Sequence, residues 1–503
     1  MARFDKERRR FLKGAGAALG MTALATQARH FGLVNALAAE RAEARSAKGI
    51  SSDYRALVCI LLNGGNDGNN TIVPIHNDAW ISNYAQYAAA RTSQGLAIPR
   101  GQLLPIAVPL HGNRTYGLHP SLGPVPQLGG INNGIHELWE QGRLAAVVNM
   151  GNLVQPLLKS QYLNTPSLRP YQLFSHSDQM QQQQSSRSDM PIPIGWGGKI
   201  ADRKNGAANP SGRVPMITSI GGVQLFTLGQ TTMPLSIGDA RTRLNEALML
   251  YGVNGADQFS AARATALSEL RNVDLDSELV RAASHIMDQA QAASSALNSF
   301  EEVTVPFPNT NIGNQMKQVA RLIKKRGELN INRQLFFVEL GGFDSHQNQL
   351  YGQTSQTSLL AQLSQAMRAF YDEMSAQNML ERVTQFTLSD FGRTLNPSGI
   401  GSGVGTDHGW GNHMLVLGGS VVGGEFYGSF RPDGSGNIFP TLQQGGPDDV
   451  DIGSAPRGRW LPTTSVEQYA GTLSRWFGLT GSDITAVFPN IVNFPTSDLG
   501  FMA

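Results

Sequence analysis

The sequence has almost no cysteine, no long hydrophobic run and little excess charge. Cys59 is the single cysteine among 503 residues and lies in an apolar stretch. This excludes an intrachain disulfide and a cysteine metal cluster, and it favours a buried thiol. Because no segment of about 20 uninterrupted apolar residues is present, we expect no transmembrane span. A content of 41 % hydrophobic residues and 56 glycines is typical of a globular chain with many tight turns.

The first residues have the three parts of a twin-arginine export signal. The stretch Arg8–Lys13 reads RRRFLK, a weakly apolar segment covers 14–25, and Ala36-Leu37-Ala38 is a small-residue cleavage candidate. The alternative is a basic amphipathic surface helix. The pattern predicts a signal peptide at residues 1–38, the twin-arginine translocase as a partner during export, and a periplasmic or secreted protein. Without these residues, seven of them basic and two acidic, the formal charge falls from +2 to −3, so we expect no nucleic-acid partner.

Apolar runs separated by helical patterns indicate the fold class. An amphipathic helix at 357–376 connects two of these runs, and a strand–helix–strand unit of this length favours parallel strands. The sequence therefore predicts an α/β fold over residues 50–503, in which helices sandwich a parallel-rich central sheet. The runs predicted to be strands lie at 56–62, 144–148, 334–340, 383–388 and 414–417.

Residues 210–330 have a different pattern, which predicts an insertion or cap within the same domain. Strand-like pieces at 214–220 and 223–228 precede a long helical stretch from about 257 to 299 and a shorter helix at 312–326. Further helices are expected at 134–141 and 465–479.

Four short motifs carry most of the chemically active side chains. They are GGNDG at 64–68, GGFDSH at 341–346, SDFGRT at 389–394 and TDHGWGNH at 406–413. The first three directly follow predicted strands, and ligands of open α/β sheets bind at the carboxyl ends of strands. Carboxylates and imidazoles on neighbouring loops are suitable ligands for a divalent cation such as Zn, Mg, Mn or Ca.

The acidic residues of these motifs are candidate metal ligands, and each has a structural alternative. Asp67 lies among glycines that allow a close backbone approach, although Asn-Asp-Gly is also common in turns. Asp344 and His346 are two residues apart, so in an extended segment they face the same side, as ligands or as a hydrogen-bonded pair. Asp390 ends a predicted strand and is a ligand candidate or a cap.

The last motif and two further residues complete the candidate site. Asp407, His408 and His413 crowd the entry to the fifth strand and are metal candidates, one histidine being alternatively a supporting group or proton donor. Arg393 could orient an anionic substrate or simply pair with an acid. Ser175 precedes a predicted helix and is the candidate nucleophile, with Ser177 as the alternative and a helix cap as the structural explanation.

Together these motifs resemble domain-of-unknown-function family 1501, whose members are mostly twin-arginine exported bacterial proteins. The resemblance covers nearly the whole mature chain, and the family is similar to the alkaline phosphatase and sulfatase superfamily. It implies an alkaline-phosphatase-like fold and assigns roles by motif. Those roles are a first-strand metal ligand for Asp67, the nucleophile region for Ser175, a second-site pair for Asp344 with His346, and further ligands for Asp390 and His408.

Two departures from the superfamily pattern leave the composition of the site open. Phe391 stands where the superfamily commonly has a histidine, and His346 is two residues past Asp344 where four is common. Two metals, one metal, a calcium-type site and a lapsed enzyme all remain as alternatives.

The resemblance and the motifs predict an exported, metal-dependent hydrolase of phosphate or sulfate esters, with a small anionic ester as substrate. The alternative is a non-catalytic envelope or extracellular binding protein that retains the hydrolase fold. An exported redox enzyme is suggested by the export signal alone, since the sequence has no dinucleotide fingerprint.

Overall fold

The computed structural model describes residues 53–125, 133–247, 257–271 and 302–503, together with residues 284, 293, 294, 296 and 297. The predicted signal peptide at 1–38 lies outside the described residues, and so does most of the predicted helix at 257–299 beyond Arg271. In these described ranges, none of the helices combines the length and the hydropathy that a membrane span requires.

A central sheet of nine strands organises the described part of the chain, in the order β11-β5-β10-β9-β1-β8-β6-β7 with β12 paired to β5. Every pairing is parallel except those of β10, which runs antiparallel to both β5 and β9. The predicted parallel-rich α/β fold is therefore confirmed. The strands are β1 Arg55–Asn63, β5 Leu144–Gly151, β6 Ile217–Ile220, β7 Leu235–Ile237, β8 Arg333–Gly341, β9 Val383–Ser389, β10 Asn412–Gly418, β11 Phe426–Tyr427 and β12 Thr464–Ser465.

Strand β1 lies at the centre of the sheet and explains why its sequence is apolar throughout. The side chains of residues 56–62 are all buried, because alternate residues of a strand point to opposite faces and both faces are covered. Strands β8 and β9 both pair with β1 rather than with each other. All five strands predicted from apolar runs are present at their expected positions.

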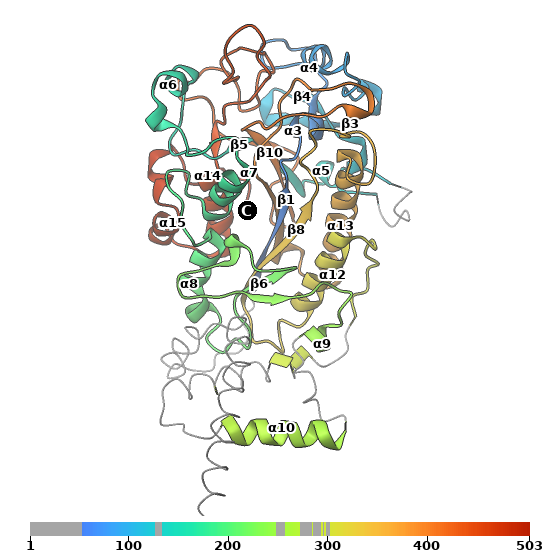
Figure 1. Cartoon of the computed structure of the whole chain (residues 1–503), viewed down its shortest axis with the longest axis vertical. Coiled ribbons are helices and arrows are strands. Elements are labelled where there is room, and N and C mark those ends of the chain that lie inside the picture. Colours follow the sequence, from blue (N-terminus) through green and yellow to red (C-terminus); the bar gives the residue numbers. More distant parts are fainter. Residues whose placement is uncertain are drawn as a thin grey trace, which may run out of the picture.

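Two layers of helices cover the sheet (Figure 1). Helices α12 (Asn311–Lys324) and α13 (Gln356–Ala376) share a core with Val58 and Ile60 of β1. Apolar residues of helices on the opposite face pack with the intervening residues of β1, such as Leu57 and Leu61. These helices are α8 Trp196–Ala208, α14 Val466–Phe477 and α15 Gly481–Val487.

A small antiparallel sheet, not predicted from the sequence, is formed by β2 (Ile72–Pro74), β4 (Arg114–Leu118) and β3 (Leu104–Val108). The strand predicted at 223–228 is wrong, because its residues form a 3-10 turn at Leu225–Thr227. The remaining α-helices of the described ranges are α3 Gly68–Thr71, α4 Tyr84–Arg91, α5 Glu137–Glu140, α6 Lys159–Asn164, α7 His176–Ser185, α9 Leu244–Ala247 and α10 Gln258–Arg271.

The block at 210–330 contributes directly to the main layers. Strands β6 and β7 extend the central sheet beyond β8, and α12 packs against α13 and β8. The described part of this block therefore extends the sandwich, while its status as an insertion stays a prediction.

Candidate metal centre

Three polar loops meet at one edge of the central sheet. Asp344 follows β8 and Asp390 follows β9, so both lie at the carboxyl ends of parallel strands. Because β10 runs in the opposite direction, its amino end lies at the same edge, and so does the loop at 406–411 that leads into it. Backbone hydrogen bonds join the loops, from Thr406 N to Ser345 O (3.0 Å) and from Gly409 N to Gly392 O (2.7 Å).

Two glycines after β1 allow these loops to come together. Gly64 and Gly65 have φ values of 113° and 82°, in the region that favours glycine. A Cβ on Gly64 would lie 2.3 Å from the backbone nitrogen of Asp344, and one on Gly65 would lie 2.7 Å from the ring of Phe391. The GGNDG motif therefore serves close backbone packing beneath the site.

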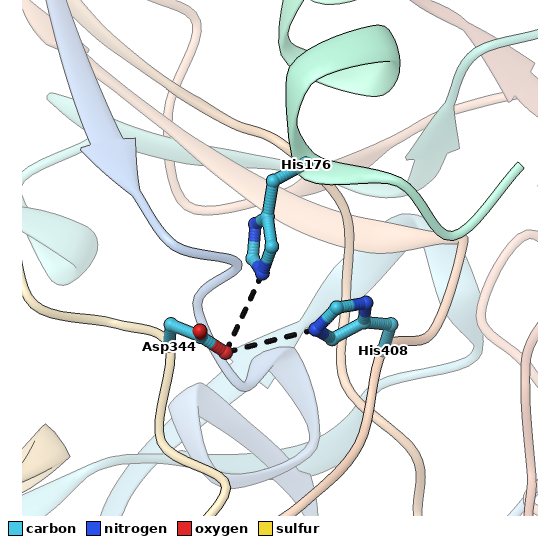
Figure 2. A group of neighbouring side chains, drawn as sticks. All are labelled: His176, Asp344 and His408. Carbon is cyan, nitrogen blue, oxygen red and sulfur yellow. Dashed lines mark ion pairs between the residues drawn. The ribbon is translucent and has the colours of Figure 1, made fainter. Parts of the chain in front are cut away.

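One carboxylate oxygen, Oδ1 of Asp344, is the hub of the site (Figure 2). Three histidine Nε2 atoms lie near it, at 3.2 Å for His346, 3.4 Å for His176 and 3.7 Å for His408. The ligand atoms of His176, Asp344 and His408 all lie within 4.8 Å of one another and could hold a metal ion.

The second nitrogen of each imidazole is held by an acceptor. Nδ1 of His176 lies 2.8 Å from Oδ2 of Asp390, and Nδ1 of His346 lies 3.0 Å from Oδ1 of Asp407. Nδ1 of His408 donates to the carbonyl oxygen of Phe174 at 2.7 Å. A carbonyl can only accept, so the proton of neutral His408 is on Nδ1 and its Nε2 lone pair faces the hub. The carboxylates hold the other two rings in the same way, and this arrangement is typical of metal-binding histidines.

The donor set fits a divalent cation. The Nε2 atoms of His346 and His408 lie 2.9 Å apart, and the carboxylate of Asp344 adds negative charge. Nε2 of His176 is buried and has no hydrogen-bond partner among the described residues. A cation between these atoms would bind the nitrogens and the carboxylate oxygen together. Nitrogen ligands combined with one carboxylate favour zinc over calcium or magnesium.

The protonation of the site follows from its surroundings. The hydrogen bond that His176 donates to Asp390 raises the pKa of His176 above its usual value, although burial opposes this. Burial lowers the pKa of His408. Burial, the largest single influence, would raise the pKa of Asp344, but Arg393, His176 and His346 together outweigh it and lower that pKa, so the carboxylate stays ionised.

Asp67 has a different environment from the hub. Its carboxylate is buried, with Oδ2 at 2.6 Å from Arg91 Nη1 and Oδ1 at 3.1 Å from Arg91 Nη2. Nε2 of Gln349 also donates to Oδ2, at 2.6 Å, and the backbone N–H of Asn69 donates to Oδ1. The structure therefore does not bring Asp67 into the group of ligand atoms around Asp344.

His413 is also held away from the hub. Its Nδ1 accepts from the backbone N–H of Asn149 at 3.1 Å, and its ring stacks on Phe439 with 4.7 Å between centroids. Complete burial lowers the pKa of His413 to about 3, so the ring is neutral. Asp390 and Asp407 lie behind His176 and His346, and Asp407 also pairs with Arg457.

Arg393 lies beneath the hub and is buried. Its Nη2 donates to Oδ1 of Asp344 at 3.1 Å, while Nε and Nη1 have no hydrogen-bond partner among the described residues. An isolated backbone bridge pairs Arg393 with His408. The guanidinium thus fixes Asp344, and its predicted contact with an anionic substrate stays a prediction.

Ser175 immediately precedes helix α7, whose first residue is His176. Its Oγ donates to Oδ2 of Asp178 at 2.6 Å, and Ser177 Oγ lies 3.1 Å from it. His176 was not among the residues predicted to bind the metal. No strand precedes it directly, so the signal that identified the other ligands was missing; its place two residues before Asp178 at a helix start was the available hint.

Two phenylalanines help to position the histidines of the site. The Phe391 ring packs against His176 and His408, with centroids 4.6 and 4.7 Å away, and so orients both imidazoles. Phe174 has φ of 69°, an uncommon value for a non-glycine residue, and its carbonyl oxygen accepts the hydrogen bond from His408 Nδ1. Arg459 contacts both Phe174 and His408. Its guanidinium lies over the Phe174 ring, and its Nε donates to His408 O at 2.8 Å.

Fold and site together define an α/β protein with a histidine–aspartate cluster at the carboxyl edge of its sheet. The chain belongs to the family described as "Protein of unknown function (DUF1501)", whose model matches residues 54–438. The family membership inferred from the motifs is thereby confirmed. No curated protein matches the sequence.

Solved structures with distant similarity to this chain include one sulfatase. Ps i-CgsB, crystallised with k-i-k-neocarrahexaose, is 10 % identical with a TM-score of 0.32 and covers 89 % of this chain and 77 % of its own. PsFucS1 sulfatase from Pseudoalteromonas sp. is 8 % identical (TM-score 0.26; 78 % and 67 % covered). The zinc complex of the C-terminal periplasmic domain of EcEptC from Escherichia coli is 9 % identical (TM-score 0.27; 74 % and 75 % covered). These scores are too low to support conclusions about activity.

Proposed function

We propose that the protein is a metal-dependent hydrolase of phosphate or sulfate esters. The observation that carries this proposal is the convergence of three histidine Nε2 atoms on Oδ1 of Asp344. The hub is accessible, since the side chains of Asp344 and His346 are 47 % and 45 % exposed. An accessible cation at this position would attract an anionic ester and stabilise the charge that develops on it.

The residues around the hub have distinct roles in this proposal. His176, Asp344 and His408 would hold the ion, and His346 would complete the ligand set. Asp390 and Asp407 would keep the histidine Nε2 atoms turned inward, since each accepts from an Nδ1 atom. Arg393 would keep Asp344 in place through its 3.1 Å hydrogen bond.

Ser175 is the proposed nucleophile, because it adjoins His176 and its Oγ is already bonded to a carboxylate. Oγ would attack the phosphorus or sulfur atom and pass its proton to Asp178, 2.6 Å away, while the bond to the alcohol oxygen breaks and the alcohol leaves with a proton from solvent. Water would then hydrolyse the phospho- or sulfo-serine, which releases inorganic phosphate or sulfate and restores the Ser175 hydroxyl. Ser177 provides a matched test, since its Oγ also lies within 3.2 Å of Asp178.

The proposal is tested by metal analysis and turnover of the purified full chain on p-nitrophenyl phosphate and p-nitrophenyl sulfate. We expect about one divalent ion per chain and turnover that a chelator abolishes. His176→Ala and His408→Ala should lose the metal and about 1000-fold in turnover, the scale on which a single electrostatic contributor acts. Ser175→Ala should lose turnover but retain the metal, and Ser177→Ala should keep both.

His136 provides the control for removing a histidine. Its Nε2 contacts the carbonyl oxygen of Pro105, away from the cluster, so His136→Ala should keep metal content and turnover within about twofold, as for a surface substitution. Bound metal without turnover on either ester would leave a non-catalytic binding protein as the better description, and absence of metal would remove the basis of the proposal.

We also propose export through the twin-arginine translocase and a periplasmic or secreted location. The support is the three-part pattern within residues 1–38. Replacing Arg8, Arg9 and Arg10 with lysine should retain the protein in the cytoplasm, whereas the wild-type chain should be found in the periplasm or medium after fractionation.

A further inference from the structure

A polar cavity of about 530 Å³ lies at the same sheet edge as the metal centre, on the far side of β8. Its walls come from the carboxyl ends of β6, β7 and β8 and from the start of α12. Gly341 lines the cavity, and Asp344 follows three residues later, so their Cα atoms are no more than about 11 Å apart. The volume is within the range of cavities that bind small molecules.

Glu339 is the principal polar group in this cavity, and its surroundings hold it in place. Oε1 accepts from Nδ2 of Asn63 at 2.8 Å, and Oε2 lies 3.4 Å from Nε2 of Gln224. Gln315 bonds to both the N–H and the carbonyl of Glu339, at 2.9 and 2.8 Å, and so fixes the strand against α12. Each carboxylate oxygen still has capacity for another donor.

The charges on the cavity wall disfavour an anion. Glu339 and Asp239 are acidic, whereas Arg241 is the single basic residue among the lining residues. Arg241 already pairs with Asp239 at 2.5 Å, and its Nη2 lies 3.3 Å from Oδ1 of Asn311. Glu339 therefore faces the cavity without a cationic partner among those residues. A phosphate or sulfate group would be repelled here and attracted to the metal centre.

The mixture of donors and acceptors matches hydroxyl groups. The carboxylate of Glu339 accepts, and the amides of Gln224 and Asn311 can do both, as each hydroxyl of a ligand can. Resting on the proposed function, we propose that the cavity binds the hydroxyl-rich alcohol part of the ester. The substrate class would then be a monoester of a sugar or another polyol, with its anionic group at Asp344.

Binding of neutral ligands tests the cavity independently of catalysis. The probes are methyl α-glucoside and myo-inositol as neutral polyols, ethanolamine as a cation and inorganic phosphate as an anion, titrated calorimetrically into the full chain. Gly341→Leu should fill the cavity, because residue 341 faces the same side of the strand as Glu339. A Cβ there meets one atom within 4 Å, Glu339 Oε1 at 3.9 Å, so the fold should tolerate the change.

Gly206→Leu is the matched control, because a Cβ at that exposed position meets no atom within 4 Å. We expect at least one polyol to bind, Gly341→Leu to weaken it at least tenfold, and Gly206→Leu to leave it unchanged. Glu339→Gln should weaken the polyol about tenfold, the difference between a charged and a neutral hydrogen-bond partner. Binding of ethanolamine or phosphate alone, or no effect of Gly341→Leu on the polyol, would overturn the proposal.

Kinetics separate this proposal from the function on which it rests. We expect kcat/KM to be at least tenfold higher for a hexose or inositol monoester than for ethyl phosphate or ethyl sulfate, and Gly341→Leu to remove that difference. Equal kcat/KM values for both ester types would reject the cavity's role while the hydrolase stands. Polyol binding without hydrolysis of any ester would instead reject the hydrolase.

Discussion

Asp67 and Asp344 each follow a glycine pair at the end of neighbouring strands, yet their environments are opposite. Asp67 is fully buried and receives hydrogen bonds from Arg91, Gln349 and its own helix. Asp344 is half-exposed and faces three imidazoles with one guanidinium behind it. The first carboxylate is saturated by protein donors, whereas the second accepts a hydrogen bond from Arg393 and faces three imidazole nitrogens. The comparison shows that the neighbours, rather than the motif, decide which acid is available to a ligand.

The largest expected effect on stability comes from neutralising each of the two acids in turn. Asp67→Asn leaves buried Arg91 without its counter-ion, so the free energy of unfolding should fall by about 3–5 kcal/mol, while metal content is kept. Asp344→Asn retains an acceptor for Arg393, and the Asp344 side chain is 47 % exposed, so the metal-free protein should lose less stability than Asp67→Asn does. It should nevertheless lose the metal.

Chemical denaturation in the presence of a chelator, with metal analysis on untreated samples, measures both quantities. If Asp67→Asn removes the metal from a protein that remains folded, Asp67 belongs to the centre after all and the contrast between the two acids disappears.

A smaller effect is expected from adding metal to stripped protein. A ligand that binds only the folded state at 100 times its Kd stabilises it by about 2.7 kcal/mol. Zinc should therefore raise the thermal midpoint of the wild-type chain and of Asp67→Asn, but not of Asp344→Asn or His408→Ala. Calorimetric scans with zinc and with calcium measure this, and a larger shift with calcium would argue against the nitrogen-rich ligand set.

The last effect is the smallest when it is counted per pH unit. It concerns a third acid, Glu467, which is buried like Asp67 but lies near Lys199 and Arg187 without a matched set of donors. Burial raises its pKa from 4.5 to about 8. The folded state therefore holds a proton that the unfolded state has lost, so this stability is present below pH 4.5 and disappears as pH rises towards 8. The free energy of unfolding should fall by at most about 1.4 kcal/mol per pH unit in this window.

Glu467→Gln should flatten that dependence between pH 5 and 8, and urea unfolding across the range measures it. Burial also lowers the pKa of Lys199, to about 8, so its own contribution changes above this window. An unchanged slope in Glu467→Gln would show that another group controls the dependence.

Much of the sheet could be predicted because its central strands are buried on both faces. The stretch at 56–62 is apolar without interruption, which is what two covered faces require. The small sheet was missed because β2 has three residues and includes Pro74, so no alternating pattern could develop. The segment 223–228 has strand-like composition, but local hydrogen bonding turns it into a 3-10 turn.

Only those residues of the candidate site whose motifs flank predicted strands could be identified from the sequence. Asp344, His346 and His408 were recognisable because their motifs flank strands of the same sheet. Asp67 pairs with Arg91 because of where α4 lies. His176 lies beside Asp344 because of how α7 packs against β9. Neither contact leaves a local pattern, since each is decided by packing between segments distant in sequence.

The single oxygen Oδ1 of Asp344 serves two neighbours at once, since it accepts from Arg393 and faces the histidine nitrogens. A cation bound to this oxygen would draw lone-pair density away from the guanidinium. Cation binding and the hydrogen bond to Arg393 would then be thermodynamically linked with opposite sign, so any change that draws Arg393 away from Asp344 would tighten cation binding.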